Sequence, residues 1–319
     1  MSKYYVGVDL GGTNIAAGIT DENFKILVKG SVPTLAQRGA DAIAADMAAQ
    51  VKKLCADIGI TTDDISGAGI SAPGTVNPET GIIEYANNIN FRDYPMKKIF
   101  SELTGIPEEK IAIGNDANLA AYGEYVAGAG KGTKSLVMIT LGTGVGGGVI
   151  IDGKMITGFK FGGAELGHMV IVHNGRKCTC GRRGCFEAYC SATALVKLTK
   201  EKFVSESDTL MHEICGGDVE NVGGKTAFAA MKKGDRAGAE VVGEYIDKLA
   251  CGIANLINIF QPEILLIGGG VCNEGDHLLK PLFSKLDHEI YGTLNTKVAI
   301  AALGSDAGII GAAAASVSK

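Results

Sequence analysis

Alternating apolar and polar positions near the start of the chain predict three short strands. They cover residues 4–9, 15–20 and 26–31, with short polar or glycine-rich turns between them. Since the connections are short, we expect these strands to pair as antiparallel hairpins. A helix over 40–58 is predicted next, because apolar residues recur there at helical spacing. These apolar residues are Ile43, Met47, Val51, Leu54 and Ile58.

The same reading of the pattern predicts the remaining elements. The further strands are expected at 65–71, 111–114, 135–141, 146–151, 264–267 and 297–301, and the further helices at 117–127, 235–260 and 307–316. The chain becomes mainly helical after the cysteine-rich stretch at 178–185, whereas residues 206–225 read as irregular.

The order strand, glycine turn, strand occurs twice, at 9–19 and at 140–150. This weak repeat predicts a duplicated α/β protein in which the two glycine turns face one cleft. We place the boundary between the two lobes at Asp116. The small N-terminal α/β lobe then covers 1–116, with a C-terminal helix at about 306–319 packing back on it, and the large α/β lobe covers 117–305.

Composition narrows the class of protein. The 319 residues are 46% hydrophobic and 20% charged, which is enough for a sizeable core and two lobes. A net charge of −5 argues against a nucleic-acid surface, which normally needs a basic patch. Apolar runs fall short of the roughly 20 residues that span a bilayer, and the N-terminus does not read as a signal peptide. We therefore expect a cytoplasmic enzyme with no nucleic-acid or membrane partner.

Three thiols and an imidazole lie close together in the sequence and form a candidate metal site. Cys178, Cys180, Cys185 and His168 are the ligand types of one tetrahedral structural zinc. Gly181 and Gly184 let the backbone turn tightly between the thiols. Disulfides or simply buried thiols are the alternatives. The scattered remaining cysteines suit reduced thiols, and they are Cys55, Cys190, Cys215, Cys251 and Cys272.

Glycine turns that follow strands predict phosphate binding, because their backbone N–H groups are open to a ligand. Hairpins also use glycine, so one such turn is weak evidence, whereas two turns that each carry a threonine are stronger. A third glycine cluster ends the strand at 264–267, where α/β proteins usually hold nucleotides. The residues concerned are Gly11, Gly12, Thr13, Asn14, Gly142, Thr143, Gly144, Gly268, Gly269 and Gly270. The Walker A and dinucleotide-binding glycine patterns do not occur at these positions.

Two aspartates at strand ends are candidates for metal binding and catalysis. Asp9 precedes the first glycine turn and suits Mg²⁺, held through water, or else caps its own turn. Asp116 is the candidate catalytic base, because a carboxylate at the start of a helix can accept a hydroxyl proton in phosphoryl transfer. A helix N-cap is the competing interpretation of Asp116, and the residues alone leave the two nearly level.

A polar set suits a sugar, because carboxylates and amides bond adjacent hydroxyl groups. Its members are Asn115, Asp116, Glu165, His168 and Glu187, with Gly74 at the end of a neighbouring strand segment. His168 could serve twice, with one ring nitrogen on zinc and the other on a sugar oxygen.

These segments resemble the ROK family of bacterial sugar kinases and regulators, in the family's order and over essentially the whole chain. The matching pieces are Asp9-Leu-Gly-Gly-Thr-Asn14, Asn115-Asp-Ala-Asn118, Leu141-Gly-Thr-Gly-Val-Gly-Gly-Gly148, Glu165-Leu-Gly-His168 and Cys178-x-Cys-Gly-x-x-Gly-Cys-x-Glu187. The resemblance implies an actin-like (ribonuclease H-like) fold of two lobes, with ATP on the glycine turns and its base near Gly268–Gly270. It also implies that Asp116 is the catalytic base, and it suggests a sugar contact from Asn88.

The resemblance favours a kinase over a repressor. The family's regulators carry an N-terminal helix-turn-helix domain, whereas the first glycine turn here begins directly after Asp9. The pattern is most similar to bacterial glucokinases, which implies transfer of phosphate from ATP to the 6-hydroxyl of glucose. An N-acetylglucosamine or N-acetylmannosamine kinase and a non-catalytic sugar-binding regulator are the alternatives. The implied cofactors are ATP, Mg²⁺ and a structural Zn²⁺, and the implied assembly is a homodimer or homotetramer.

Overall fold

The computed structural model describes residues 3–86, 89–292 and 295–317. Its contacts divide the chain into two compact units. Unit 1 comprises Met1–Leu136, Gly148–Ala164 and Ala301–Lys319, and unit 2 comprises Val137–Gly147 and Glu165–Ile300. Within the described residues, the helices are all too short or too polar to cross a membrane.

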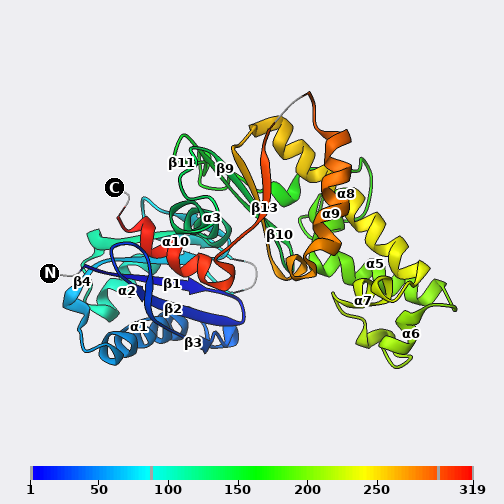
Figure 1. Cartoon of the computed structure of the whole chain (residues 1–319). Helices are drawn as coiled ribbons and strands as arrows, with labels where there is room; N and C mark the ends of the chain where they lie inside the picture. The colour runs from blue at the N-terminus through cyan, green and yellow to red at the C-terminus, as the bar shows by residue number, and fades with distance from the viewer. Residues whose placement is uncertain (1–2, 87–88, 293–294, 318–319) are drawn as a thin grey trace. The chain divides into compact units, whose positions relative to one another are not determined.

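The first sheet has the strand order β3-β2-β1-β4-β8. Figure 1 labels the strands β1 to β4 of this sheet. Its strands are β1 (Tyr4–Leu10), β2 (Asn14–Thr20), β3 (Ile26–Pro33), β4 (Ile65–Ala72) and β8 (Ile111–Asn115). The first three pair as antiparallel hairpins, as the sequence predicts, while β4 runs parallel to both β1 and β8. The carboxyl ends of β1, β4 and β8 therefore lie at one edge of the sheet.

The second sheet repeats this order as β11-β10-β9-β12-β13. Its strands are β9 (Leu136–Leu141), β10 (Val145–Ile151), β11 (Lys154–Met155), β12 (Ile264–Gly268) and β13 (Lys297–Ile300). In each sheet three consecutive strands lie side by side. Two later strands, parallel to each other, continue the sheet next to the first of these three strands. The predicted duplication is therefore confirmed in the topology.

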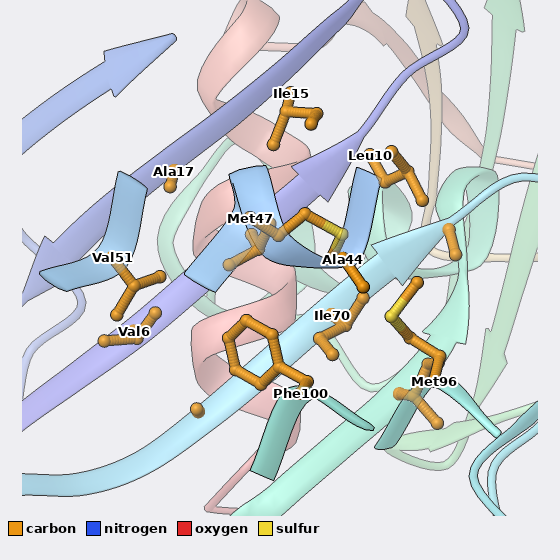
Figure 2. Close-up of a cluster of buried hydrophobic side chains, with 14 of the residues drawn as sticks. Val6, Leu10, Ile15, Ala17, Ala44, Met47, Val51, Ile70, Met96 and Phe100 are labelled. Atoms are coloured by element: carbon orange, nitrogen blue, oxygen red, sulfur yellow. The ribbon is translucent and has the colours of Figure 1, made fainter. Parts of the chain in front are cut away.

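One face of the first sheet carries the apolar core of unit 1 (Figure 2). Val6 on β1 and Ile70 on β4 pack with Met47 of α1 (Ala40–Asp57) and Phe100 of α2 (Met96–Thr104). All four side chains are fully buried. Because side chains alternate along a strand, the residues between these positions face the other side of the sheet.

That other face of the sheet is covered by α10 (Ala307–Ala315), a helix of small residues and isoleucine. A Cβ atom at Gly7 of β1 would lie 1.9 Å from the carbonyl oxygen of Ile309, and one at Gly69 of β4 would lie 1.8 Å from that of Ala312. Only glycine fits such a close approach of helix and strand backbones. The helix α3 (Asp116–Ala127) packs against α10.

Unit 2 is built around one long helix, α8 (Arg236–Phe260), which contacts α4, α5, α7 and α9. The ring of Phe186 fills the space that a side chain at Gly252 of α8 would need. The other helices are α4 (Glu187–Cys190), α5 (Ala192–Ser205), α6 (Leu210–Ile214), α7 (Thr226–Lys232) and α9 (Asp276–Glu289).

Several short elements differ from the sequence prediction. Residues 206–225 are not wholly irregular, because α6 and a 3-10 turn at Val219–Asn221 lie within them. A small core holds this segment, and it comprises Phe203, Met211, Cys215, Val222, Ala230 and Ala237. The strands β5 (Thr75–Asn77), β6 (Ile82–Tyr85) and β7 (Arg92–Tyr94) form a third sheet that the pattern did not predict. Further 3-10 turns lie at Ala36–Arg38, Thr62–Asp64, Glu108–Lys110, Leu166–His168, Gly270–Glu274 and Gly304–Asp306.

Candidate functional site

The four predicted zinc ligands converge in unit 2. One ligand atom from each of His168, Cys178, Cys180 and Cys185 lies within 4.8 Å of all the others. The Sγ atoms of Cys180 and Cys185 are 3.7 Å apart, and Nδ1 of His168 is 3.7 Å from Sγ of Cys178. Two thiolates on one tetrahedral zinc, with bonds of about 2.3 Å, should stand about 3.8 Å apart. The donor set and its spacing therefore fit zinc, and Nδ1 is the ring nitrogen of His168 that faces the Cys178 thiol.

The backbone of the cysteine loop explains why the thiols meet. Gly181 and Gly184 both have positive φ angles, of 88° and 85°. The loop closes through hydrogen bonds from the N–H of Cys178 to the carbonyl of Arg182, and from that of Gly184 to the carbonyl of Arg176. The glycines predicted to turn the chain between the thiols do so.

Two of the three thiols resist ionisation without a cation. Burial raises the pKa of Cys178, and it raises the pKa of Cys185 to about 12. The N–H of Arg182 instead lowers the pKa of the exposed Cys180. A bound dication would offset the free-energy cost of burying two thiolates. Zinc binding would therefore release protons from these thiols, as is usual for such sites.

Glu187, the predicted sugar ligand at the start of α4, connects the cysteine loop to a glycine turn. Its Oε1 accepts a hydrogen bond of 3.1 Å from the hydroxyl of Thr179 and one of 3.6 Å from the thiol of Cys178. Its Oε2 accepts a hydrogen bond of 3.0 Å from the N–H of Val145. Because a carboxylate offers about four acceptor positions, these bonds leave room for a ligand. The sequence did not indicate this role for Glu187.

The turn beside Glu187 is the second predicted phosphate turn, Gly142-Thr143-Gly144. A Cβ atom at Gly144 would lie 2.3 Å from Oε2 of Glu187, so the missing side chain makes room for the carboxylate. The turn closes through the N–H of Gly142 and the carbonyl of Gly144, 3.0 Å apart. The carbonyl of Gly142 also accepts the N–H of Ala192 at the start of α5.

The third glycine cluster lies next to this turn. Gly269 has φ +99°, and a Cβ atom there would lie 2.3 Å from the carbonyl oxygen of Leu141. Gly268 ends β12 and Gly270 begins a 3-10 turn. The structure therefore brings the two glycine segments of unit 2 together at the ends of β9 and β12.

Glu165 and His168 bracket a 3-10 turn after the long β10–β11 hairpin region. The N–H of His168 bonds the carbonyl of Glu165, and the Glu165 side chain is exposed. Gly167 lies between them, at a place where a Cβ atom would be 2.1 Å from the carbonyl oxygen of Val145. The turn is thus fixed against the start of β10.

In unit 1, Asp9 lies near the end of β1, on the face of the sheet that α10 covers. Its Oδ1 accepts a 2.7 Å hydrogen bond from the hydroxyl of Ser71 on β4. A Cβ atom at Gly308, in the first turn of α10, would lie 2.5 Å from the carboxyl carbon of Asp9. Burial raises the pKa of Asp9, although the Ser71 hydroxyl acts in the opposite direction.

The first predicted phosphate turn follows Asp9 and is exposed at Gly12, Thr13 and Asn14. The N–H of Gly11 bonds the carbonyl of Asn14, which closes the turn at 2.9 Å. The buried Thr34 supports the turn, because its hydroxyl bonds the carbonyl of Gly11 and its N–H bonds that of Thr13.

Asn115, and not Asp116, caps the helix that follows β8. Asn115 is the N-cap of α3, since its Oδ1 accepts the N–H of Asn118 at 3.2 Å. Its amide also donates to the carbonyl of Gly74, which ties a second predicted sugar residue to the same place. Asp116 is the first residue of α3, and its Oδ1 accepts the N–H of Ala117 at 2.8 Å. Asn88, the remaining predicted contact, lies outside the described residues.

Comparisons with known proteins agree with these features. A glucokinase of Thermotoga maritima is 37% identical over 310 residues, covering 97% of this chain and 95% of the relative. The crystal structure of a ROK family glucokinase from Streptomyces griseus, in complex with glucose and AMPPNP, superposes with a TM-score of 0.83 at 34% identity. It covers 99% of this chain and 100% of its own.

A more partial relative is the xylose repressor of Bacillus subtilis, 32% identical over 77% of this chain and 59% of the repressor. The ROK family profile matches residues 5–318. The duplicated sheets and the His-Cys₃ cluster are those of the actin-like, two-lobed α/β fold that the sequence predicts. On the full-length match and the shared fold, the chain belongs to the ROK family.

Proposed function

We propose that this protein is an ATP-dependent hexose kinase that transfers phosphate to the 6-hydroxyl of glucose. The observation that carries the proposal is that Asn115, and not Asp116, caps α3. Because Asn115 caps the helix, Asp116 is not needed as the cap and can serve as the catalytic base. Full-length relatives named glucokinase support the choice of reaction and of sugar.

The proposed sugar residues are Gly74, Asn88, Asn115, Asp116, Glu165, His168 and Glu187. Asp116 would accept the proton of the 6-hydroxyl as this oxygen attacks the γ-phosphate. The Asn115 amide holds the carbonyl of Gly74, so the two residues keep a fixed spacing around the base. Nδ1 of His168 is directed at the zinc ligands, which leaves Nε2 as the ring nitrogen for a sugar hydroxyl.

The proposed nucleotide residues are those of the three glycine segments, with Asp9 beside the first. Exposed N–H groups in such turns suit phosphate oxygens. Asp9 would hold Mg²⁺ through water, and the ion would offset the charge of the phosphates. The zinc ligands would fix the loop that carries Glu187.

A kinase assay tests the proposal. Purified protein with MgATP should phosphorylate glucose in preference to N-acetylglucosamine, N-acetylmannosamine and other hexoses. Preference for an acetamido sugar would replace glucose while retaining the reaction, and inactivity on every sugar would favour a non-catalytic regulator. The alternative of a non-catalytic regulator depends on the partial match to a xylose repressor.

Asp116→Ala should lower kcat by about 10²–10⁴-fold, the usual contribution of general base catalysis. Zinc content and melting temperature should stay near those of the wild type, because Asn115 still caps α3. Asp63→Ala, at an exposed position in a 3-10 turn, is the matched control. A folded Asp116→Ala protein that keeps a substantial rate would place the base elsewhere.

A further inference from the structure

The contacts of Glu187 point to a role for the residue between the first two thiols. We propose that Thr179 is a positioning residue. Its hydroxyl holds the Glu187 carboxylate on the N–H of Val145, so that the cysteine loop fixes the turn Gly142-Thr143-Gly144. The positioning role of Thr179 is independent of the proposed function. Only the treatment of this turn as a nucleotide site rests on it.

Two groups bond the same oxygen of Glu187. Oε1 accepts the Thr179 hydroxyl, at 3.1 Å, and the Cys178 thiol, at 3.6 Å. A hydroxyl is a good donor, whereas a thiol is a weak one. The hydroxyl of Thr179 therefore sets the orientation of the Glu187 carboxylate.

The other oxygen of Glu187 carries this orientation to the glycine turn. Oε2 accepts the N–H of Val145, the residue directly after the turn, at 3.0 Å. Gly144 has no side chain to separate the turn from the carboxylate, and a Cβ atom there would lie 2.3 Å from Oε2. A rotation of the carboxylate away from Thr179 would break the bond to Val145 and release this end of the turn.

Amide hydrogen exchange at Val145 tests the positioning role without any substrate. In zinc-loaded protein, Thr179→Val keeps the shape of the side chain but removes the hydroxyl, and it should speed exchange at Val145. Thr179→Ser restores the hydroxyl and should exchange as the wild type does. Thr80→Val, at an exposed threonine in unit 1, is the matched control and should change nothing at Val145.

The zinc content of Thr179→Val shows whether faster exchange at Val145 comes from the loss of the bond to Glu187 or from the loss of the metal. Thr179→Val should retain the wild-type amount of zinc, since its side chain is not among the four ligands. Unchanged exchange at Val145 in a zinc-loaded Thr179→Val protein would overturn the proposal. Loss of zinc from that variant would overturn it as well, because Thr179 would then support the ligands and not Glu187.

Nucleotide affinity gives the functional readout. Thr179→Val should weaken AMPPNP binding by about five- to tenfold, which corresponds to the net contribution of one typical hydrogen bond, and Thr179→Ser should bind normally. Unchanged AMPPNP affinity in a variant with faster exchange would contradict the link to the nucleotide site. A wild type that binds no AMPPNP would contradict the proposed function, while the exchange result would still decide the role of Thr179.

Discussion

At the residue scale, Asp9 combines a proposed functional role with an unfavourable environment. Its carboxylate lies between the Ser71 hydroxyl and the backbone of Gly308, and burial raises its pKa. A carboxyl group whose pKa is raised in the folded state stabilises the fold below its unfolded pKa of about 3.9. That contribution is lost as the pH rises through the folded pKa, so the ionised form at neutral pH costs stability.

We therefore expect Asp9→Asn to be more stable but less active than the wild type. The amide oxygen can still accept the Ser71 hydroxyl, but the side chain no longer carries a buried charge or binds Mg²⁺ well. At pH 7.5 the melting temperature should rise, and the gain should shrink near pH 4. Under saturating MgATP and glucose, kcat should fall by about 100-fold or more. A lower melting temperature at pH 7.5 would contradict the view that burial of the charge is costly.

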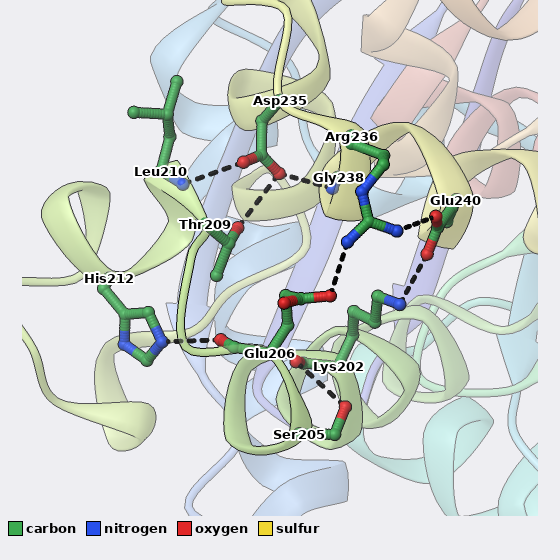
Figure 3. Close-up of polar contacts among 10 residues, drawn as sticks. All are labelled: Lys202, Ser205, Glu206, Thr209, Leu210, His212, Asp235, Arg236, Gly238 and Glu240. Atoms are coloured by element: carbon green, nitrogen blue, oxygen red, sulfur yellow. Dashed lines mark hydrogen bonds and ion pairs between the residues drawn. The ribbon is translucent and has the colours of Figure 1, made fainter.

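At the element scale, Asp235 at the start of α8 holds part of the segment 206–225, whose sequence shows no regular apolar pattern (Figure 3). Asp235 is the N-cap of α8 and accepts the N–H of Gly238 at 2.6 Å. It also accepts the N–H of Leu210 and the hydroxyl of Thr209, both at 2.9 Å, and so holds the start of α6. Arg236 pairs with Glu206 and Glu240 close by, but exposed ion pairs of this kind contribute little.

The Asp235 cap should make this part of unit 2 sensitive to acid. Burial acts to raise the pKa of Asp235, but the hydrogen bonds from Gly238, Leu210 and Thr209 outweigh it, so the pKa lies below its usual value. Such a group stabilises the fold above its unfolded pKa of about 3.9, and this stability is lost as the pH falls through the folded pKa.

Asp235→Ala should cost about 1–3 kcal/mol at pH 7, since it removes a helix cap and leaves buried donors without their acceptor. Urea unfolding at pH 7 and near pH 3.5 measures the effect, which should be smaller at the lower pH. Asp208→Ala, at an exposed aspartate in the same region, should have little effect. An equal loss of stability at both pH values would show that the charge of Asp235 is not what stabilises the cap.

Sequence patterns predicted the elements whose periodicity is strong and missed those that depend on distant contacts. The strands β1, β2 and β9 and the helices α1 and α8 lie close to the expected ranges, since apolar alternation or helical spacing marks each of them. The three-residue strands β5 and β7 are too short to show a period.

The candidate site divides in the same way. Ligand types and spacing predicted the His-Cys₃ cluster, because structural zinc sites use thiolates and imidazoles that lie a few residues apart in the sequence. Sequence alone did not choose between base and cap for Asp116, because Asn115 and Asp116 are both good caps; the hydrogen bond from Asn118 to Asn115 makes Asn115 the cap. The pairing of Glu187 with Val145 joins residues far apart in the chain, and nothing in the local pattern indicates it.

At the scale of the whole molecule, the candidate zinc site belongs to one unit while the candidate base belongs to the other. His168 and the three cysteines lie in unit 2, whereas Asp9 and Asp116 lie in unit 1. The core of unit 1 rests on apolar packing of the first sheet with α1 and α2, and the glycine contacts of α10 hold the opposite face. Those contacts contain no zinc ligand, so metal loss should act unequally on the two units.

We expect removal of zinc by a strong chelator to loosen unit 2 and leave the core of unit 1 protected. Without the ion, no metal bonds hold the four ligands of the cysteine loop together, so the loop that carries Thr179 and Glu187 is less constrained. Hydrogen exchange should rise at residues 168–190 and 142–147, and it should change little in β1, β4 and α10. Cys180→Ser should reproduce this pattern and lower zinc content and sugar binding together. Equal loss of protection in both units would mean that the zinc loop stabilises the whole chain, and loss of zinc without loss of sugar affinity would separate the metal from the sugar site.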